Sequence, residues 1–241
     1  MKEKQGVRFP RIKILWSWLQ FPVLAMLLIA GIIWLNIQQS QLSLQLSQQQ
    51  RATALQNAHD QQQEALLMNY MDTITNLIVH DKLLTAQVAN PPDAVVVVAG
   101  ARTREVLKKL DPDRKATLMR FLYETKLINN DHRMISMFGA DLQHAHLRAI
   151  DLRDTYLAGA NLSGADLRGA NLTYATLSYV NLTGANLAGA DLHGSDMHNV
   201  DLTGADLTRA NLKDAFDLGD TLFAKAKSLS GATMLDGTVH P

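Results

Sequence analysis

Carboxylate and imidazole side chains recur at regular spacing in the second half of this chain. Between residues 140 and 214 every acidic residue is an aspartate: Asp141, Asp151, Asp154, Asp166, Asp191, Asp196, Asp201, Asp206 and Asp214. The same stretch contains four imidazoles: His144, His146, His193 and His198. Two carboxylates in different environments can act as general acid and general base, and imidazoles can bind metal ions. Either chemistry depends on how the chain positions these residues.

The regular spacing comes from an unbroken five-residue repeat that runs from Ala140 to Asp214. Its fifteen pentads have Leu at the third position, apart from Met197. A helix would spread these Leu side chains around its surface, and a continuous strand would alternate them between two faces because five is odd. A chain that turns once per pentad directs every Leu at one axis. The first position is small or β-branched, so we expect it to point inward beside Leu.

The last position of seven pentads suits a turn with positive φ because it is Gly: Gly159, Gly164, Gly169, Gly184, Gly189, Gly194 and Gly204. Pentads such as Ala160–Gly164, Ala165–Gly169 and Ala185–Gly189 resemble the A-(D/N)-L-x-x repeats of the pentapeptide-repeat protein family. The resemblance implies a mainly β repeat domain, a right-handed quadrilateral β-helix (a solenoid) with four pentads per coil and about four coils. The pattern loses register after Asp214, so residues 215–241 are expected to form a C-terminal cap or tail.

On such a coil, residues twenty apart would stack in columns that mix Asp with Asn, as in Asp141, Asn161, Asn181 and Asp201. Catalysis by paired carboxylates needs a cleft that separates their pKa values, and a convex rod provides none. His193 and His198 would lie on adjacent faces, which falls short of the three or four convergent ligands of a metal site. We therefore predict no catalytic, metal-binding or cofactor-binding residues and no cofactor.

Residues that depart from the repeat are the candidate interaction surface. They are His146, Tyr156, Arg168, Tyr174 and Tyr179. Arg and Tyr are enriched at protein interfaces. A plain solvated surface is the alternative interpretation.

Residues 14–37 are typical of a transmembrane helix. The centre from Phe21 to Leu35 is apolar, and about 20 residues are enough to span a bilayer. Indole side chains, which favour the membrane interface, lie near both ends: Trp16, Trp18 and Trp34. A cleaved signal peptide is the main alternative. The length of the segment and the lack of a small-residue cleavage site after Leu35 argue against it.

Charge around this segment predicts its orientation. The basic tail, residues 1–13, carries five Lys or Arg residues. The first 28 residues after Ile37 contain a single Lys or Arg residue, Arg51. The positive-inside rule then places the N-terminus in the cytoplasm and the C-terminal domain outside it, with the opposite orientation as the alternative. The chain has 23 basic and 23 acidic residues, so its charge does not suggest a nucleic-acid partner, and it has no Cys for disulfides or thiolate chemistry.

Residues 38–90 are expected to form a helical stalk. Gln38–Gln63 is Gln-rich, and a parallel coiled coil is one alternative there, although no Leu heptad persists for three repeats. Residues 91–139 are expected to form a small helical module that caps the first coil. Asn90-Pro91-Pro92 interrupts the chain before it, and Asp111-Pro112 supplies an N-cap and first-turn proline for a helix.

Part of this module extends the resemblance. The stretch Ala101–Leu107, followed by Asp113–Lys115 and Arg120–Glu124, is similar to the helical segment before the repeats in a membrane-anchored bacterial subset of the family. The resemblance covers roughly residues 66–236 and implies no known activity.

These features favour a non-enzymatic, single-pass membrane protein that presents a rigid β-helix to a protein partner. Its predicted partners are the lipid bilayer, through residues 14–37, and an unknown protein, with a homo-oligomer as a further option. One alternative is a DNA-mimic protein that binds topoisomerase, as the resemblance implies for some members. The repeat has nine acids against five bases, a net charge of only minus four, which disfavours that alternative. The other is an enzyme of unrecognised type.

Overall fold

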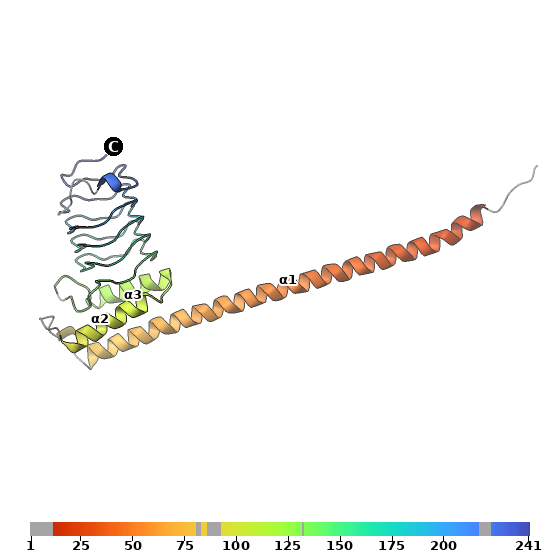
Figure 1. Ribbon diagram of the computed structural model, residues 1–241, viewed down its shortest axis with the longest axis horizontal. Coiled ribbons are helices and arrows are strands. Elements are labelled where there is room, and N and C mark those ends of the chain that lie inside the picture. The colour runs from red at the N-terminus through yellow and green to blue at the C-terminus, as the bar shows by residue number, and fades with distance from the viewer. Residues whose placement is uncertain (1–11, 81–82, 86–92, 132, 217–222) are drawn as a thin grey trace, which may run out of the picture. The chain divides into compact units, whose positions relative to one another are not determined.

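The computed structural model describes residues 12–80, 83–85, 93–131, 133–216 and 223–241. The chain divides into two units, Met1–His59 and Asp60–Pro241. The described helices are α1 (Ile12–Val79), η1 (Leu83–Thr85), α2 (Ala94–Leu107), α3 (Pro112–Glu124) and η2 (Phe223–Lys225). The repeat occupies the chain between α3 and η2 (Figure 1).

Helix α1 contains the predicted apolar segment and most of the predicted stalk without interruption. The part of α1 from Pro22 to Val79 is long and apolar enough to cross a membrane by length and composition. The stalk was expected to reach residue 90, but α1 ends at Val79. No Gly or Pro stands near Val79 to signal this end. The predicted break at Asn90-Pro91-Pro92 lies outside the described residues.

The last turns of α1 belong to the same unit as α2, α3 and the repeat. Leu67, Tyr70 and Ile74 are buried at helical spacing on one face of α1. The end of α1 therefore belongs with α2 and α3, although it lies outside the range of 91–139 that was predicted for the helical module. At the start of α3, the Asp111 carboxylate accepts a hydrogen bond from the backbone N–H of Arg114 (2.9 Å), and proline follows the cap. This confirms the predicted N-cap.

Backbone pairing in the repeat joins residues twenty apart. Asp141 forms a parallel bridge with Asn161, and Asn161 forms one with Asn181. The backbone N–H of Leu142 donates to the carbonyl of Asn161 (2.8 Å). These bridges are isolated and involve the second position of each pentad, so the chain pairs briefly and then turns. For each parallel bridge from Asp141 to Asp196, the partner lies four pentads further along.

The inner positions of the pentads form the core, as predicted. Each of the fifteen third-position side chains, Met197 included, is at most 1% exposed, and each first-position residue is at most 2% exposed. Where the first position is polar, the hydroxyl is satisfied locally. Thr155 and Ser195 donate to the carbonyls of Leu152 (2.6 Å) and Leu192 (2.8 Å).

Every pentad from Ala140 to Asp214 ends at a residue with positive φ. Seven of these residues are the predicted glycines. The other eight are side-chain-bearing residues: His144, Ala149, Asp154, Tyr174, Tyr179, Asn199, Arg209 and Asp214. A non-Gly residue in this conformation costs about 1–2 kcal/mol. We call these fifteen positions the corners of the repeat.

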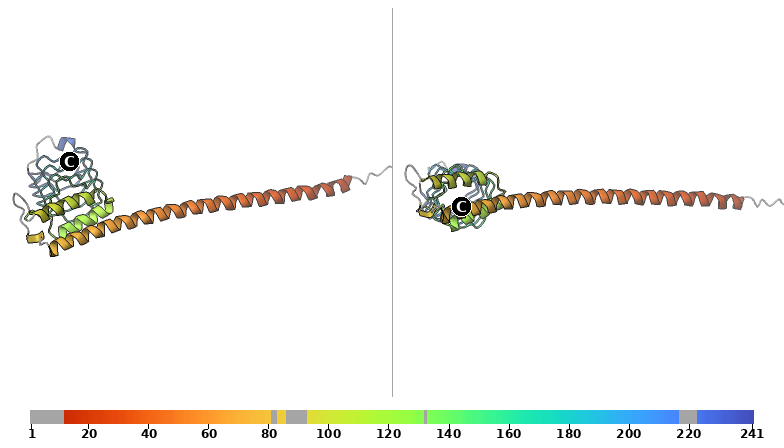
Figure 2. Two further views of the ribbon diagram at one scale, coloured as in Figure 1. Left: turned by 60° about the horizontal axis from the view of Figure 1, so that its bottom comes forward. Right: turned by 90° about the horizontal axis from the view of Figure 1, so that it is seen from below.

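The helical module contacts the first coil, and Figures 1 and 2 show α2 and α3 at that end of the stacked coils. The ammonium group of Lys115, in α3, is buried and lies 3.2 Å from an Asp141 carboxylate oxygen. After α3, Asn129 forms an antiparallel bridge with Thr155. The bridge pairs backbone groups that a solenoid would otherwise expose at its end, and the ion pair holds α3 against the first coil.

At the other end, the register was expected to change after Asp214, but Phe216 still bridges to Asp196, twenty residues earlier, and the change comes later in the chain. Asp206 and Asn211 bridge to Ser228 and Thr233, each 22 residues further along instead of 20. Two residues have therefore been inserted, and Leu229 and Met234 follow the bridged residues as third positions do. An antiparallel bridge from Val239 to Thr233 covers the last pentad. Leu218 and Leu222, which were expected to join this cap, lie outside the described residues.

Candidate interaction surface

The Asp and Asn side chains at the second position of the pentads form hydrogen bonds within the turns. In most pentads the side-chain oxygen Oδ1 of the second residue accepts a hydrogen bond from the backbone N–H two residues later. The backbone N–H of Thr203 donates to Asp201 (2.9 Å), and that of Thr183 donates to Asn181 (2.9 Å). Hydrogen bonds from the side chain and backbone of Thr203 lower the pKa of Asp201 below its ordinary value. The described residues contain no group of three or more His, Asp or Glu that could hold a metal ion.

Tyr174 and Tyr179 project from successive corners. Their φ angles are 56° and 60°, and the residues are 54% and 59% exposed. A bulky side chain with positive φ is unusual because the conformation is strained. The turn therefore fixes two large aromatic rings at equivalent points, one pentad apart.

Each of these tyrosines stacks on a histidine of the next coil. The rings of Tyr174 and His193 meet edge to face, with centroids 5.3 Å apart, and the phenol oxygen lies 3.1 Å from His193 Nε2. His193 Nδ1 is also 2.9 Å from the carbonyl oxygen of Lys213. The rings of Tyr179 and His198 have the same centroid distance, 5.3 Å, and an interplanar angle of 80°. We call these the two Tyr–His pairs.

Gly194 provides space for the first pair. A Cβ atom at Gly194 would lie 2.5 Å from Cε1 of Tyr174, which is far too close for a real contact. The Tyr174 ring therefore lies directly over the glycine corner of the next coil. Close packing against a Cα without a side chain fixes the ring while its outer face stays exposed.

Each pair has an aspartate in the pentad that supplies its histidine. Asp191 and Asp196 occupy second positions in the pentads that supply His193 and His198. Asp191 accepts a hydrogen bond from the Asn211 amide (2.9 Å), and Asp196 accepts one from the Ser178 hydroxyl (2.6 Å). The surface thus combines aromatic faces with hydrogen-bonded acids.

Of the other three predicted surface residues, His146 and Arg168 belong to a different column of pentads, whereas Tyr156 bridges to Thr176 in the pentad of Tyr179. His146 Nδ1 is 2.8 Å from an Asp113 oxygen in α3. Tyr156 is half-buried, with the Arg133 guanidinium 4.3 Å from its ring centroid. Arg168 forms an ion pair with Asp166 in its own pentad. These three side chains contact other residues of the chain, which leaves Tyr174 and Tyr179, at successive corners, as the predicted residues that belong to the Tyr–His pairs.

Sequence reasoning missed the histidines as members of this surface. His193 and His198 were considered only as metal ligands and rejected, whereas each packs against a tyrosine 19 residues earlier. The signal was present, because the two tyrosines and the two histidines share the same five-residue offset. It could be recognised only with the stacking of coils in view.

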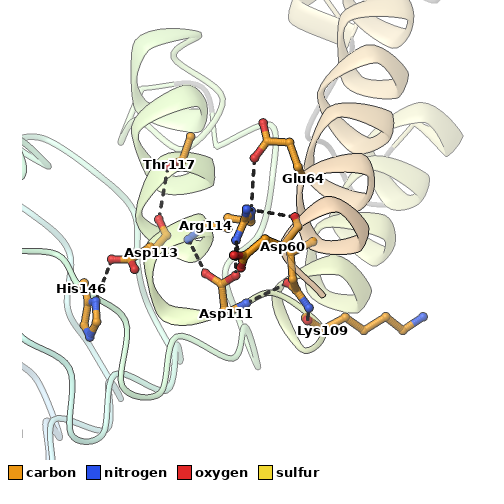
Figure 3. Close-up of polar contacts among 9 residues, drawn as sticks. Asp60, Glu64, Lys109, Asp111, Asp113, Arg114, Thr117 and His146 are labelled. Carbon is orange, nitrogen blue, oxygen red and sulfur yellow. Dashed lines mark hydrogen bonds and ion pairs between the residues drawn. The ribbon is translucent and has the colours of Figure 1, made fainter. Parts of the chain in front are cut away.

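A separate polar cluster joins α1 to α3 (Figure 3). The Arg114 guanidinium donates to Asp111 (2.6 Å), to Glu64 (3.2 Å) and to the carbonyl of Asp60 (3.0 Å). The Gln63 amide donates to the carbonyl of Lys109 (3.1 Å) and accepts from the backbone of Asp111 (3.0 Å). Each of these groups has a partner, so the cluster is structural.

Acid should weaken this cluster. Burial alone would raise the pKa of Asp111, but hydrogen bonds from Arg114 outweigh it, and the net pKa lies below its ordinary value of 3.8. A carboxyl with a lowered folded-state pKa stabilises the fold fully above its unfolded pKa, and this contribution is lost as pH falls towards the folded value. In urea unfolding, the stability advantage of the native chain over Asp111→Asn should therefore shrink below about pH 4. An advantage that does not change between pH 7 and pH 2 would contradict this assignment.

A small cavity between α1 and α2 does not suggest a substrate site. Its volume is about 100 Å³, and Leu66, Tyr70, Arg102 and Val106 are among its lining residues. Sites for drug-sized ligands are typically about 300–1,000 Å³. Inside the module, the buried Tyr70 hydroxyl lies 2.6 Å from that of Thr103, so this polar pair is satisfied.

The family match to known proteins covers the repeat. Residues 135–173 and 175–214 match the family described as pentapeptide repeats, in eight copies. Among solved structures, Rfr23 from the cyanobacterium Cyanothece 51142 is 37% identical over 31% of this chain and 51% of its own, with a TM-score of 0.31. The fluoroquinolone resistance protein QnrB1 is 26% identical over 40% of this chain and 48% of its own, with a TM-score of 0.35.

A third structure, alr5209 from Nostoc Pcc 7120, is 30% identical over 36% of this chain and 84% of its own, with a TM-score of 0.16. The chain spans about half the length of the first two structures. No curated protein matches it.

Proposed function

Because this chain belongs to the pentapeptide-repeat family, we propose that it is a non-enzymatic, single-pass membrane protein whose repeat binds a protein partner. The two Tyr–His pairs form the binding surface. Tyr174 and Tyr179 are more than half exposed in a conformation that Gly would adopt without strain. Rigid aromatic side chains at the centre of an interface contribute much of its binding energy. The exposure of these two tyrosines in a strained conformation is the main support for the proposal.

The pentads wind a right-handed quadrilateral β-helix of about four coils. The bridges between residues twenty apart support four pentads per coil. Residues 91–139, together with the end of α1, cap the first coil. Residues 215–241 continue and close the last.

Residues 14–37 anchor the protein in the lipid bilayer, with the N-terminus in the cytoplasm. The apolar composition of α1 supports an anchor, and the five basic residues before it support the orientation. A reporter fused after Pro241 should be active only as an extracytoplasmic enzyme. Activity of a cytoplasmic reporter at that position would reverse the orientation.

Removal of both tyrosine rings should abolish partner binding without destabilising the repeat. Tyr174→Gly/Tyr179→Gly deletes the rings and relieves the positive-φ strain, so the free energy of unfolding should stay within about 1 kcal/mol of the native value. Crosslinking in cells that express the full chain, followed by binding with the purified partner, should show affinity falling by roughly tenfold or more.

A matched control uses two other strained corners. Ala149→Gly/Arg209→Gly makes the same backbone change at φ angles of 51° and 58°, but in pentads on a different face. This variant should bind the partner normally. Equal loss in both variants would assign the effect to the backbone, and full binding by the tyrosine variant would reject the Tyr–His surface.

A further inference from the structure

A short segment after α3 pairs with the repeat in the antiparallel direction. Asn129 bridges to Thr155. The backbone N–H of the next residue, Asn130, donates to the carbonyl of Asp154 (2.7 Å), which is the corner residue just before Thr155. The carbonyl of Asn130 accepts a hydrogen bond from Arg133 Nε (3.1 Å). The backbone of Asn130 is therefore held on both sides, by the repeat and by its own loop.

The side chain of Asn130 reaches one coil further along the repeat. Its Nδ2 group donates to the carbonyl of Tyr174 (2.9 Å), and its Oδ1 accepts a hydrogen bond from the Thr176 hydroxyl (3.0 Å). Tyr174 is the corner twenty residues after Asp154, so it belongs to the same column. A carboxamide suits both contacts because its nitrogen only donates and its oxygen only accepts. Asn130 thus joins two successive corners, with its backbone on one and its side chain on the other.

The Tyr174 carbonyl that Asn130 holds is not used by the regular hydrogen bonds of the repeat. In the pentad that begins at Ala160, the carbonyls of the first four residues accept backbone N–H groups, whereas the carbonyl of the corner, Gly164, accepts none from the described residues. The Tyr174 corner has a positive φ, a conformation that a bulky residue adopts only under strain. A hydrogen bond to its carbonyl fixes the peptide group that leaves the corner, and with it the direction in which the ring projects.

The second Tyr–His pair lacks this support. The carbonyl of Tyr179 accepts no hydrogen bond from the residues that the structure describes. Its ring packs on His198 as the Tyr174 ring packs on His193. The two tyrosines therefore share the same local packing and differ in their contact with Asn130, so Tyr179 is an internal control.

We propose that Asn130 is a positioning residue that holds Tyr174 in the orientation recognised by the protein partner. This inference rests on the function proposed above for the Tyr–His pairs. The binding surface then has two sources, because the repeat supplies the rings and the helical module fixes one of them. The first Tyr–His pair should depend on Asn130, and the second should not.

Two substitutions separate the contacts of Asn130. In Asn130→Asp the carboxylate can still accept from the Thr176 hydroxyl, but it cannot donate to the Tyr174 carbonyl and repels that oxygen. The matched control, Thr176→Val, removes the hydroxyl and leaves the hydrogen bond to Tyr174 intact. Asn130→Ala removes both contacts without adding a charge, so it provides a second variant if the carboxylate disturbs the fold.

Fluorine NMR measures the ring positions directly. Fluorotyrosine replaces Tyr174 or Tyr179 in the full-length chain in detergent. Asn130→Asp and Asn130→Ala should shift or broaden the signal from position 174 more than Thr176→Val does, while the signal from position 179 stays unchanged. A merely structural role would disturb both rings. An unchanged signal at position 174, or equal changes at the two positions, would overturn the proposal.

Affinity for the partner that crosslinks to the native chain provides a second measurement. Asn130→Asp should weaken binding roughly threefold to tenfold, the effect of one or two hydrogen bonds. In a Tyr174→Gly background the same substitution should have no further effect, because the ring that Asn130 positions is absent. An equal loss in both backgrounds would count against positioning. The fluorine signals do not involve the partner, so normal binding by Tyr174→Gly/Tyr179→Gly would reject the Tyr–His surface while the NMR comparison still decided the role of Asn130.

Discussion

Leu172→Ala should lower the free energy of unfolding by about 2–5 kcal/mol. Leu172 is 1% exposed and belongs to the column of third-position side chains at the axis of the repeat. The backbone N–H of Leu172 donates to the carbonyl of Asp191 (2.7 Å), and similar bonds hold the neighbouring coils. The coils therefore cannot collapse easily into the space that a truncated side chain leaves. Urea unfolding of the full-length chain in detergent, followed by circular dichroism, measures the effect.

The matched control for this variant is Leu172→Met. Methionine already fills the equivalent inner position at Met197, which is fully buried. A swap that keeps the volume should cost less than about 1.5 kcal/mol. If Ala and Met lowered stability equally, the axis would not be closely packed, and the role assigned to the leucine column would be wrong.

Gly194→Ala should destabilise the chain more than Gly169→Ala, although the two glycines have the same φ of 64°. At Gly169 no atom lies within 4 Å of an added Cβ, so only the positive-φ strain, about 1 kcal/mol, is expected. At Gly194 the added Cβ would also displace the Tyr174 ring from His193. Loss of an aromatic contact adds about 0.5–1.5 kcal/mol, and partner binding through the Tyr–His pairs should weaken.

A double-mutant cycle separates these two causes. In a Tyr174→Gly background, Gly194→Ala should cost no more than Gly169→Ala because the ring is already absent. The difference between the backgrounds measures the coupling between residues 174 and 194. An excess cost at Gly194 that survives without the ring would show that the clash with Tyr174 is not its origin.

The period of the repeat predicted the core of this protein well. A period of five residues is incompatible with a helix or a straight strand, so the burial of residues such as Leu142 and Ala140 followed from their spacing alone. The end of the regular repeat was harder to predict. Two inserted residues shift the bridges to Ser228 and Thr233, and a search at a fixed step of five no longer aligns Leu229 and Met234 with the earlier leucines.

The candidate surface could be predicted only in part. Tyr174 and Tyr179 stood out as departures from the repeat, but their partners His193 and His198 are defined by contacts between coils. His146 looked equally available in sequence, yet the docking of α3 brings Asp113 against it. Such contacts depend on how separate elements pack, and a local pattern contains no information about them.

The positive-φ corners also bear on how this surface can change through mutation. Glycine fits a corner without strain, and eight other side chains are accommodated there at a modest cost. The backbone φ is positive in both cases. Some large corner residues need glycine at the corner twenty residues later, as Tyr174 does at Gly194 and His144 does at Gly164. Binding specificity in such a rod can therefore diverge through pairs of stacked corners while the buried core is retained.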